Sequence, residues 1–422
     1  MIRFRLSQTA YDLGSTLLAT PLAMAFGLGA CALATEQLEG WLGVPRWTSL
    51  EPGTAQVTLA TLAGSLMTVV SVVYSVLLVA LSLASVQFST RILAILLRDR
   101  VSQAVLGLFL GTFVWLLVAL RSIRFDPPAV PLLTVSAAVG LALASLAALV
   151  VFIDRVVHSI QANHLVARIA AETEPIIDQT FPAGGPARDT VHVAPPAGAR
   201  LVPSVRTGYV QLVDLEALAA LAAPGVRIHL LRGPGAFVPA GAALWAVAGP
   251  LDDRRLDEVI DLGALRTHQQ DAEWGFRQIV DIGLKAISPA VNDPSTAATC
   301  IDHLSALLIR AGVRGSLDAC AAVGAGEVAI PWPRYSDLVD LAFEQLRQYG
   351  KGDMAILLRL SRAVGDVAEV VRHPEGRSRL AAHARQIHAA GRAAFPAEDC
   401  EELERRYERI RRLLGEGFTA AG

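Results

Sequence analysis

Hydroxyl side chains recur every seven residues along one long apolar segment of this chain. The residues on this interval are Thr54, Thr61, Thr68, Ser75, Ser82 and Ser89, and Thr58 and Ser65 lie beside them. Seven residues is close to two turns of an α-helix, so these hydroxyls line one face of a single helix. A membrane helix with a polar stripe along its whole length faces either water or another helix on that side.

Two interpretations of the stripe are open. Small and hydroxyl residues let membrane helices approach closely, and Ala60 and Gly64 fit such packing. Packing alone does not require six successive hydroxyls, however, and a seven-residue repeat keeps one face toward a common axis, as in a left-handed bundle. On the same face Val72, Val79 and Val86 would form a constriction that gates by dewetting. The predicted pore lining is Thr54, Thr58, Thr61, Ser65, Thr68, Val72, Ser75, Val79, Ser82, Val86 and Ser89.

No charged residue interrupts this stripe, which favours passive conduction over charge-coupled transport. Gln87, Arg91 and Arg98 follow at the cytosolic end and would ring the mouth of a pore in an oligomer. Rings of arginine favour anions, but the excess of basic residues on the cytoplasmic side of membrane proteins explains the same arginines. The permeant species therefore stays open.

A second group of polar residues lies in the C-terminal half. It consists of Arg266, Thr267, Gln270, Asp271, Asp281, Ser288, Asn292 and Asp293. One interpretation is a ligand or ion site. The other is a structural network in which Arg266 pairs with Asp271 and carboxylates cap helices. Asp293 before Pro294 is typical of a helix start, because proline at the first helical position lacks a donor that would be unpaired anyway.

Signals for enzymes and cofactors are weak. The sequence has no G-x-S-x-G, no Walker loop and no H-E-x-x-H, and its 4 cysteines show no C-x-x-C spacing. We therefore expect no catalytic activity, no metal and no cofactor. The part after the apolar segments is mildly acidic, which gives no reason to expect nucleic acid as a partner.

The elements that must position these residues begin with four membrane spans. The chain has 422 residues, of which 53% are hydrophobic, and the excess over a soluble protein is concentrated near the N-terminus. We predict spans at Leu13–Ala34, Val57–Gln87, Ala104–Leu120 and Leu132–Ile153. The first resembles a signal peptide, with Arg3 and Arg5 before it, but its apolar stretch is longer than a signal core.

Arginines near the span ends predict the orientation. One side holds Arg3, Arg5, Arg91, Arg98, Arg100, Arg155 and Arg168, and the other holds Arg46, Arg121 and Arg124. The positive-inside rule places both termini in the cytoplasm of a bacterium, with the spans in its inner membrane. The C-terminal part is then cytosolic.

The predicted fold class is mainly α, with four transmembrane helices followed by a cytosolic α+β domain. We divide the chain into a membrane domain (1–155), a membrane-proximal helix and linker (156–200), a small β-rich module (201–250) and a helical domain (251–422). Asp257–Ala264 is predicted as the first of the C-terminal helices.

Several motifs resemble those of a known family. They are the segment from Ser75 to Arg91, the pattern R-T-x-x-Q-D at 266–271, G-F-x-Q-I-V-D at 275–281 and S-P-A-V-N-D-P at 288–294. In this order they are similar to the bacterial predicted membrane proteins called domain of unknown function 2254, which usually have proline where Thr90 stands. The resemblance implies four spans and a cytosolic domain, and it implies no particular activity.

These observations predict an oligomeric inner-membrane channel whose second span lines a hydroxyl-rich pore and whose cytosolic domain gates or filters it. The expected partners are the lipid bilayer, further copies of the chain and a permeant ion. The alternative is a membrane-anchored sensor or assembly module without conduction, in which the stripe joins helices within one four-helix bundle.

Overall fold

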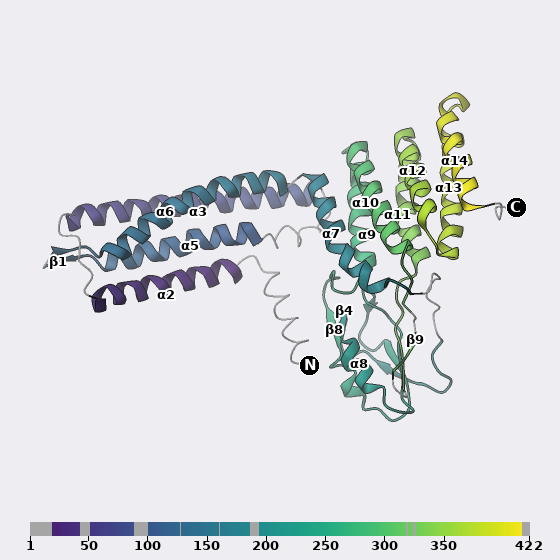
Figure 1. Ribbon diagram of the computed structural model, residues 1–422, viewed down its shortest axis with the longest axis horizontal. Helices are drawn as coiled ribbons and strands as arrows, with labels where there is room; N and C mark the ends of the chain where they lie inside the picture. Colours follow the sequence, from purple (N-terminus) through teal and green to yellow (C-terminus); the bar gives the residue numbers. More distant parts are fainter. Residues whose placement is uncertain are drawn as a thin grey trace. The chain divides into compact units, whose positions relative to one another are not determined.

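The computed structural model describes residues 19–42, 51–87, 100–126, 128–159, 161–185, 194–317, 320–323 and 326–415. Contacts divide the chain into two units, residues 2–161 and residues 162–422. The first, which holds the four apolar helices, is called the membrane unit, the other is called the second unit, and each is described by itself (Figure 1).

The membrane unit consists of four apolar helices. They are α2 (Ala19–Leu42), α3 (Pro52–Gln87), α5 (Arg100–Arg121) and α6 (Leu132–Ser159), and each is long and apolar enough to cross a bilayer. A short hairpin of β1 (Arg124–Phe125) and β2 (Pro128–Ala129) joins α5 to α6. The prediction of four spans is confirmed. The first helix runs further than expected, to Leu42, and the residues predicted before Ala19 lie outside the described part.

Helix α5 is the centre of this unit because it packs against α2, α3 and α6. Its side toward α2 carries Gly107 and Gly111, and a Cβ atom on Gly111 would lie 2.3 Å from Leu28 Cδ1. Glycine is therefore what lets α2 and α5 approach closely, as small residues do between membrane helices. The hydroxyls of Thr112 and Ser145 meet at 3.1 Å and join α5 to α6.

Glu39 explains why α2 continues past its apolar run. Its carboxylate accepts hydrogen bonds from the backbone N–H groups of Leu133 at 2.6 Å and Thr134 at 3.2 Å, and from the Thr134 hydroxyl. These donors are at the start of α6, where backbone N–H groups have no partner within the helix. A buried anion at a helix N-terminus is stabilised by the helix dipole as well. Glu39 therefore caps α6 from a neighbouring helix.

The second unit contains two sheets around one core. The first sheet has the strand order β3 (Arg200–Pro203), β7 (Ala243–Ala248), β5 (Arg227–Leu230), β10 (Gly326–Ala329) and β9 (Cys320–Val323). The second has the order β6 (Phe237–Val238), β4 (Gly208–Val213) and β8 (Ile260–Gly263). Helix α8 (Leu215–Leu221) follows β4, and a short 3₁₀ turn, η2 (Asp253–Arg255), precedes β8. Val210, Ile228 and Trp245 belong to the shared hydrophobic core.

The helices of this unit form two parallel rows (Figure 1). One row is α10 (Pro294–Gly312), α12 (Met354–Val370) and α14 (Glu401–Leu414), each packed on the next. The other is α9 (Ala272–Ala286), α11 (Tyr335–Gly350) and α13 (Pro374–Ala394). Helix α7 (Ala162–Thr180) packs against both α9 and α10, and the turn η3 (Ala397–Cys400) leads into α14.

The structure shows the predicted fold class, with the membrane helices first and an α+β region after them. The helix predicted at Asp257–Ala264 is wrong, because this segment holds β8, which pairs antiparallel with β4. The sheets also take β9 and β10 from well beyond the predicted β-rich module. Pairing with strands far away in the sequence gives β8 and β10 their extended conformation, and helical periodicity in the local sequence did not predict it.

Candidate functional site

The hydroxyl-bearing face of α3 is exposed in this chain. The described members of the predicted lining that are exposed are Thr54, Thr58, Thr61, Ser65, Thr68, Val72, Ser75, Val79 and Ser82. The side of α3 that packs into the membrane unit is different. It is lined by Ala55, Leu59, Ala63, Leu66, Val70 and Val73. At about 100° per residue, the centres of the two faces lie about 150° apart around the helix.

This arrangement excludes one interpretation of the stripe. If the hydroxyls joined α3 to the other helices of its own bundle, they would be buried against α5 or α6. Instead, apolar residues make those contacts, and the described hydroxyls point away from them. The stripe therefore faces something other than the described helices of the membrane unit.

Each of several hydroxyls donates to the backbone of its own helix. Thr58 bonds to the carbonyl oxygen of Thr54 at 2.8 Å, Thr61 to that of Val57 at 2.7 Å, and Ser75 to that of Ser71 at 2.9 Å. Such bonds to the residue four positions earlier occupy the O–H donor. The hydroxyl oxygen keeps a free lone pair, since it can accept as well as donate. The face therefore presents acceptor oxygens to its surroundings.

Several residues of the predicted pore lie at the edge of the exposed hydroxyl-bearing face of α3 or beyond the part whose side chains are described. Ser65 also borders an apolar cavity of about 230 Å³ among α3, α5 and α6, so it marks the edge of the exposed face. Val86 and Gln87 lie at the end of α3, where only the backbone is described. Ser89, Arg91 and Arg98, predicted at the cytosolic mouth, lie outside the described residues.

The predicted polar group of the second unit separates into two parts. Arg266, Thr267, Gln270 and Asp271 precede or begin α9, whereas Ser288, Asn292 and Asp293 follow its end, and Asp281 lies on the helix between them. A helix of 15 residues is about 22 Å long. The eight residues therefore do not form one site.

The first part is built on a buried ion pair. Arg266 donates from Nε to Asp271 Oδ2 at 2.7 Å and from Nη2 to Oδ1 at 2.9 Å. Asp271 is only 4% exposed, and its Oδ1 also accepts from the backbone N–H of Trp274 at 3.1 Å, which caps α9. The Arg266 guanidinium lies 5.1 Å from the ring centre of Trp274, a cation–π distance. Pairing and capping explain these residues as a structural network, as one interpretation predicted.

Burial nevertheless sets the chemistry of Asp271. Removal from water raises the pKa of its carboxyl group to about 6, and the attraction of Arg266 opposes this increase only in part. Burial also raises the pKa of Glu273, which lies in the first turn of α9. Asp271 is thus a carboxyl group that takes up a proton close to neutral pH.

A cavity of about 210 Å³ adjoins this pair. Its walls include Gly233 and Gly235 of the turn before β6, Trp332, and the carboxylates Glu273 and Asp337. Gly235 has a φ of +85°, and a Cβ atom there would lie 2.1 Å from Asp271 Oδ2. Only glycine fits, because the turn must adopt the left-handed conformation directly against the carboxylate.

Gln270 fixes α9 to the sheet. Its side-chain amide accepts from the backbone N–H of Val213 at 2.8 Å and donates to the carbonyl oxygen of Val213 at 2.9 Å. It therefore bonds to the last residue of β4 as another strand would. Thr267, in contrast to Gln270, forms no such bond: its buried hydroxyl has no hydrogen-bond partner among the described residues.

The second part of the group forms the turn between α9 and α10. Ser288 donates to the carbonyl oxygen of Lys285 at 2.7 Å, and Asn292 has a φ of +51°. Asp293 accepts from the backbone N–H of Thr296 at 3.0 Å and from its hydroxyl at 2.5 Å, and these bonds lower the pKa of Asp293. The predicted helix start at Asp293–Pro294 is confirmed. Among the described residues no group of three or more His, Cys, Asp or Glu side chains is arranged to hold a metal ion.

Sequence reasoning missed a polar groove in the second unit. Four arginines from α12 and α14 line a cavity of about 460 Å³ together with Asp366 and Glu402. The residues that meet there are about 40 positions apart in the sequence, so no short motif marks them.

Comparison with known proteins identifies relatives of this chain. The model of the family described as "Predicted membrane protein (DUF2254)" matches residues 14–366. An uncharacterised protein of Mycobacterium bovis and one of Mycobacterium tuberculosis are each 33% identical over 360 residues, which covers 81% of this chain and 68% of theirs. No solved structure matches. The chain therefore belongs to the family of predicted membrane proteins DUF2254.

Proposed function

We propose that several copies of this protein bring their α3 helices together around a water-filled path in the inner membrane of a bacterium. The hydroxyl-bearing face of α3 would line this path, and the second unit, on the cytoplasmic side with both termini, would gate or filter it. One observation carries the proposal: this face lies opposite the packed face of α3, and no described helix of the membrane unit covers it.

The main competing arrangement has the stripe facing lipid. Hydroxyls bonded to their own helix backbone tolerate lipid, so the hydrogen bonds alone do not decide between the two. The surface of α6 gives a comparison within the same chain. Between Val139 and Ile153 its exposed residues are all apolar, with Leu143, Leu146 and Val150 the most prominent, and its hydroxyl, Ser145, is buried. The exposed surface of α6, which we expect to face lipid, is thus free of hydroxyls over that stretch.

The repeat of the stripe supports an assembly of several α3 helices. Positions seven apart drift by only about 20° per repeat on a straight helix, and a left-handed supercoil removes this drift. Each helix then keeps one face toward a shared axis over its whole length. The exposed valines on this face, Val72 and Val79, would narrow the path at two levels, as hydrophobic constrictions do in channels.

Conduction is proposed without a catalytic step and without a cofactor. The acceptor oxygens of the face would replace part of the hydration shell of a permeant ion, and the arginines at the cytosolic end would add positive charge at one mouth. Because these two features favour opposite signs of charge, no permeant species is assigned. Without a pore, the same fold would serve as a membrane-anchored sensor or assembly module.

Accessibility of single cysteines tests the proposal. Thr61, Thr68, Ser75 and Ser82 would each be replaced by cysteine in a background without native cysteines, and the protein in native membranes treated with a charged thiol reagent. We expect modification at these positions. Matched cysteines at Leu143 and Leu146 of α6, which are also exposed in the single chain, should be protected by lipid. Protection of all four α3 positions to the same degree as the α6 controls would contradict the proposal.

A further inference from the structure

A groove between α12 and α14 is lined by four arginines and two carboxylates. Its volume of about 460 Å³ lies within the range of small-molecule sites. The lining consists of Ser361, Arg362, Gly365, Asp366, Glu402, Arg405, Arg406, Arg409 and Ile410. Four guanidinium groups thus face two carboxylates in the lining itself, and two further carboxylates outside it, Glu401 and Glu369, pair with Arg405 and Arg409. This groove is unrelated to α3, and nothing in the proposed conduction depends on it.

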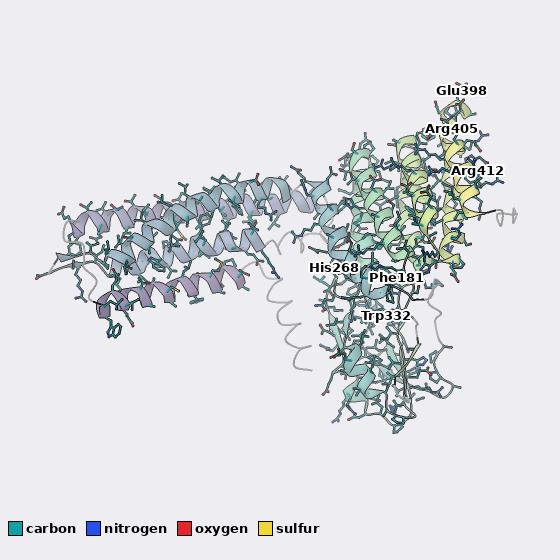
Figure 2. The ribbon with its side chains drawn as sticks, viewed as in Figure 1. Phe181, His268, Trp332, Glu398, Arg405 and Arg412 are labelled. Carbon is teal, nitrogen blue, oxygen red and sulfur yellow. The ribbon has the colours of Figure 1, made fainter. Side chains whose placement is uncertain are left out.

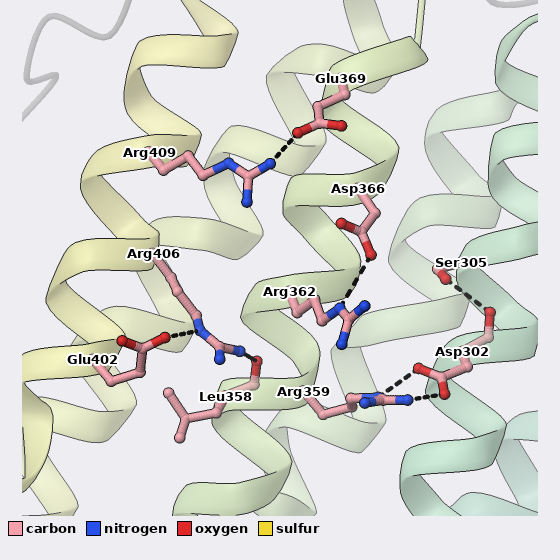
Figure 3. A network of polar contacts seen from close by, with 10 residues as sticks. All are labelled: Asp302, Ser305, Leu358, Arg359, Arg362, Asp366, Glu369, Glu402, Arg406 and Arg409. Carbon is pink, nitrogen blue, oxygen red and sulfur yellow. Dashed lines mark hydrogen bonds and ion pairs between the residues drawn. The ribbon is translucent and has the colours of Figure 1, made fainter.

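The positions of the arginines follow from the two helices. Ile410 is buried and lies 3.5 Å from where a Cβ atom of Gly365 would be, so the helices approach closely at that level. Arg405, Arg406 and Arg409 project from α14, and Arg362 projects from α12 (Figures 2 and 3). They therefore surround one hollow without sharing a helix.

The carboxylates present occupy only part of this arginine set. Glu402 serves two guanidinium groups at once: it accepts from Arg405 Nη2 at 2.6 Å and from Arg406 Nε at 2.6 Å. Arg406 also donates to the backbone carbonyl of Leu358 (Figure 3). These bonds lower the pKa of Glu402, because hydrogen bonds from Arg406 and Arg405 favour its charged form.

Arg362 and Arg409 keep donors for a further partner. Arg409 bonds to Glu369 through Nη2, and Arg362 approaches Asp366 only through Nε, at 3.6 Å (Figure 3). A guanidinium carries five N–H donors in a planar fork. Among the described residues, Nε and Nη1 of Arg409 and both terminal nitrogens of Arg362 have no hydrogen-bond partner. These two arginines are more than half exposed, so a ligand can reach them.

We propose that this groove binds a small soluble anion with one or more phosphate groups. Phosphate oxygens match the paired donors of a guanidinium fork, and several forks around one hollow provide bonds in different directions. The hydroxyl of Ser361, in the same lining, would add a neutral donor. The pair of Arg409 with Glu369 joins the two helices, and Glu402 pairs with arginines of its own helix. These ion pairs use neither the hollow nor the remaining donors.

Calorimetric titration of the full-length protein in detergent with inorganic diphosphate tests this inference, at constant ionic strength. The wild type should bind diphosphate saturably, and orthophosphate more weakly because it makes fewer bonds. The double variant Arg362→Gln/Arg409→Gln should bind about tenfold more weakly or worse, since each change removes charge-assisted bonds. The single variant Arg409→Lys, which keeps the charge and loses the fork, should fall between the two.

A matched control uses the same helix. Arg411 and Arg412 lie on α14 outside the groove, so Arg411→Gln/Arg412→Gln removes the same charge and should leave the affinity for diphosphate within about twofold. An equal loss in both double variants would mean nonspecific attraction and would overturn the inference. Absence of saturable binding by the wild type would overturn it as well, whatever the variants do.

Discussion

Replacing Arg266 by methionine should destabilise the second unit strongly, and more so at alkaline pH. The substitution leaves Asp271 buried, 4% exposed, without the cation that bonds to both of its oxygens. Removing one partner of a buried ion pair costs about 3–5 kcal/mol, because the remaining charge is uncompensated. For a unit of this size that corresponds to roughly 10 °C in melting temperature.

The pH dependence follows from the pKa of Asp271, which is raised from 3.8 to about 6 in the folded protein. Between these values the folded state binds more protons than the unfolded state, so stability decreases as the pH rises through this window. The shift corresponds to about 3 kcal/mol for this group in the wild type. Without Arg266 the pKa increases further, because both lowering effects of Arg266 are lost. The deficit of the variant relative to wild type should therefore be larger at pH 8 than at pH 5.

The assay is thermal melting of the full-length protein in detergent, followed by circular dichroism at both pH values. Arg334 provides a matched control, since it forms the same two-ended pair with Asp337, at 2.8 and 2.7 Å, on a much more exposed surface. Arg334→Met should cost less than about 1 kcal/mol. An equal effect of the two substitutions, or a deficit of Arg266→Met that does not change with pH, would refute the reasoning.

Three further predictions concern backbone and capping positions, each measured as a melting temperature of the full-length protein. Gly235→Ala should destabilise the protein by more than about 3 kcal/mol, because it combines left-handed backbone strain with a clash against Asp271. Gly198→Ala is the control: it has the same strain, about 1–3 kcal/mol, but its Cβ atom would meet no neighbouring atom, so its effect should be smaller. Glu39→Gln should cost about 1 kcal/mol or more, since it weakens the cap on α6, and no loss would contradict the cap. Gly111→Ala should weaken the α2–α5 contact and lower the melting temperature, whereas Gly140→Ala, whose Cβ atom would meet no neighbouring atom, should not. Equal melting temperatures of the two variants would contradict this role of Gly111.

Features encoded locally could be predicted from the sequence. The start of α10 at Asp293–Pro294 depends on bonds within three residues, and the pair of Arg266 with Asp271 spans five. The four membrane helices follow from hydrophobic length alone. The periodicity of α3 likewise placed its hydroxyls on one face, although it did not reveal whether that face would be covered.

Features that depend on distant pairing could not be predicted in the same way. Strand β10 pairs in parallel with β5, so that Glu327 lies beside Arg227, 100 positions earlier in the sequence. The sequence pattern of neither strand indicates which strand it pairs with. Strand β8 looked helical because four residues are too few to show a period. The arginine groove combines α12 with α14, so it exists only after the helices have packed.

The central claim, that the hydroxyl-bearing face of α3 borders water in an assembly, is tested most directly by recording single-channel currents from the purified protein in planar bilayers. We expect discrete current steps. Replacing Val79 by serine should increase the open time or the conductance, because a polar side chain makes dewetting of the path less favourable. Silent bilayers at high protein density, with insertion verified, would contradict the account.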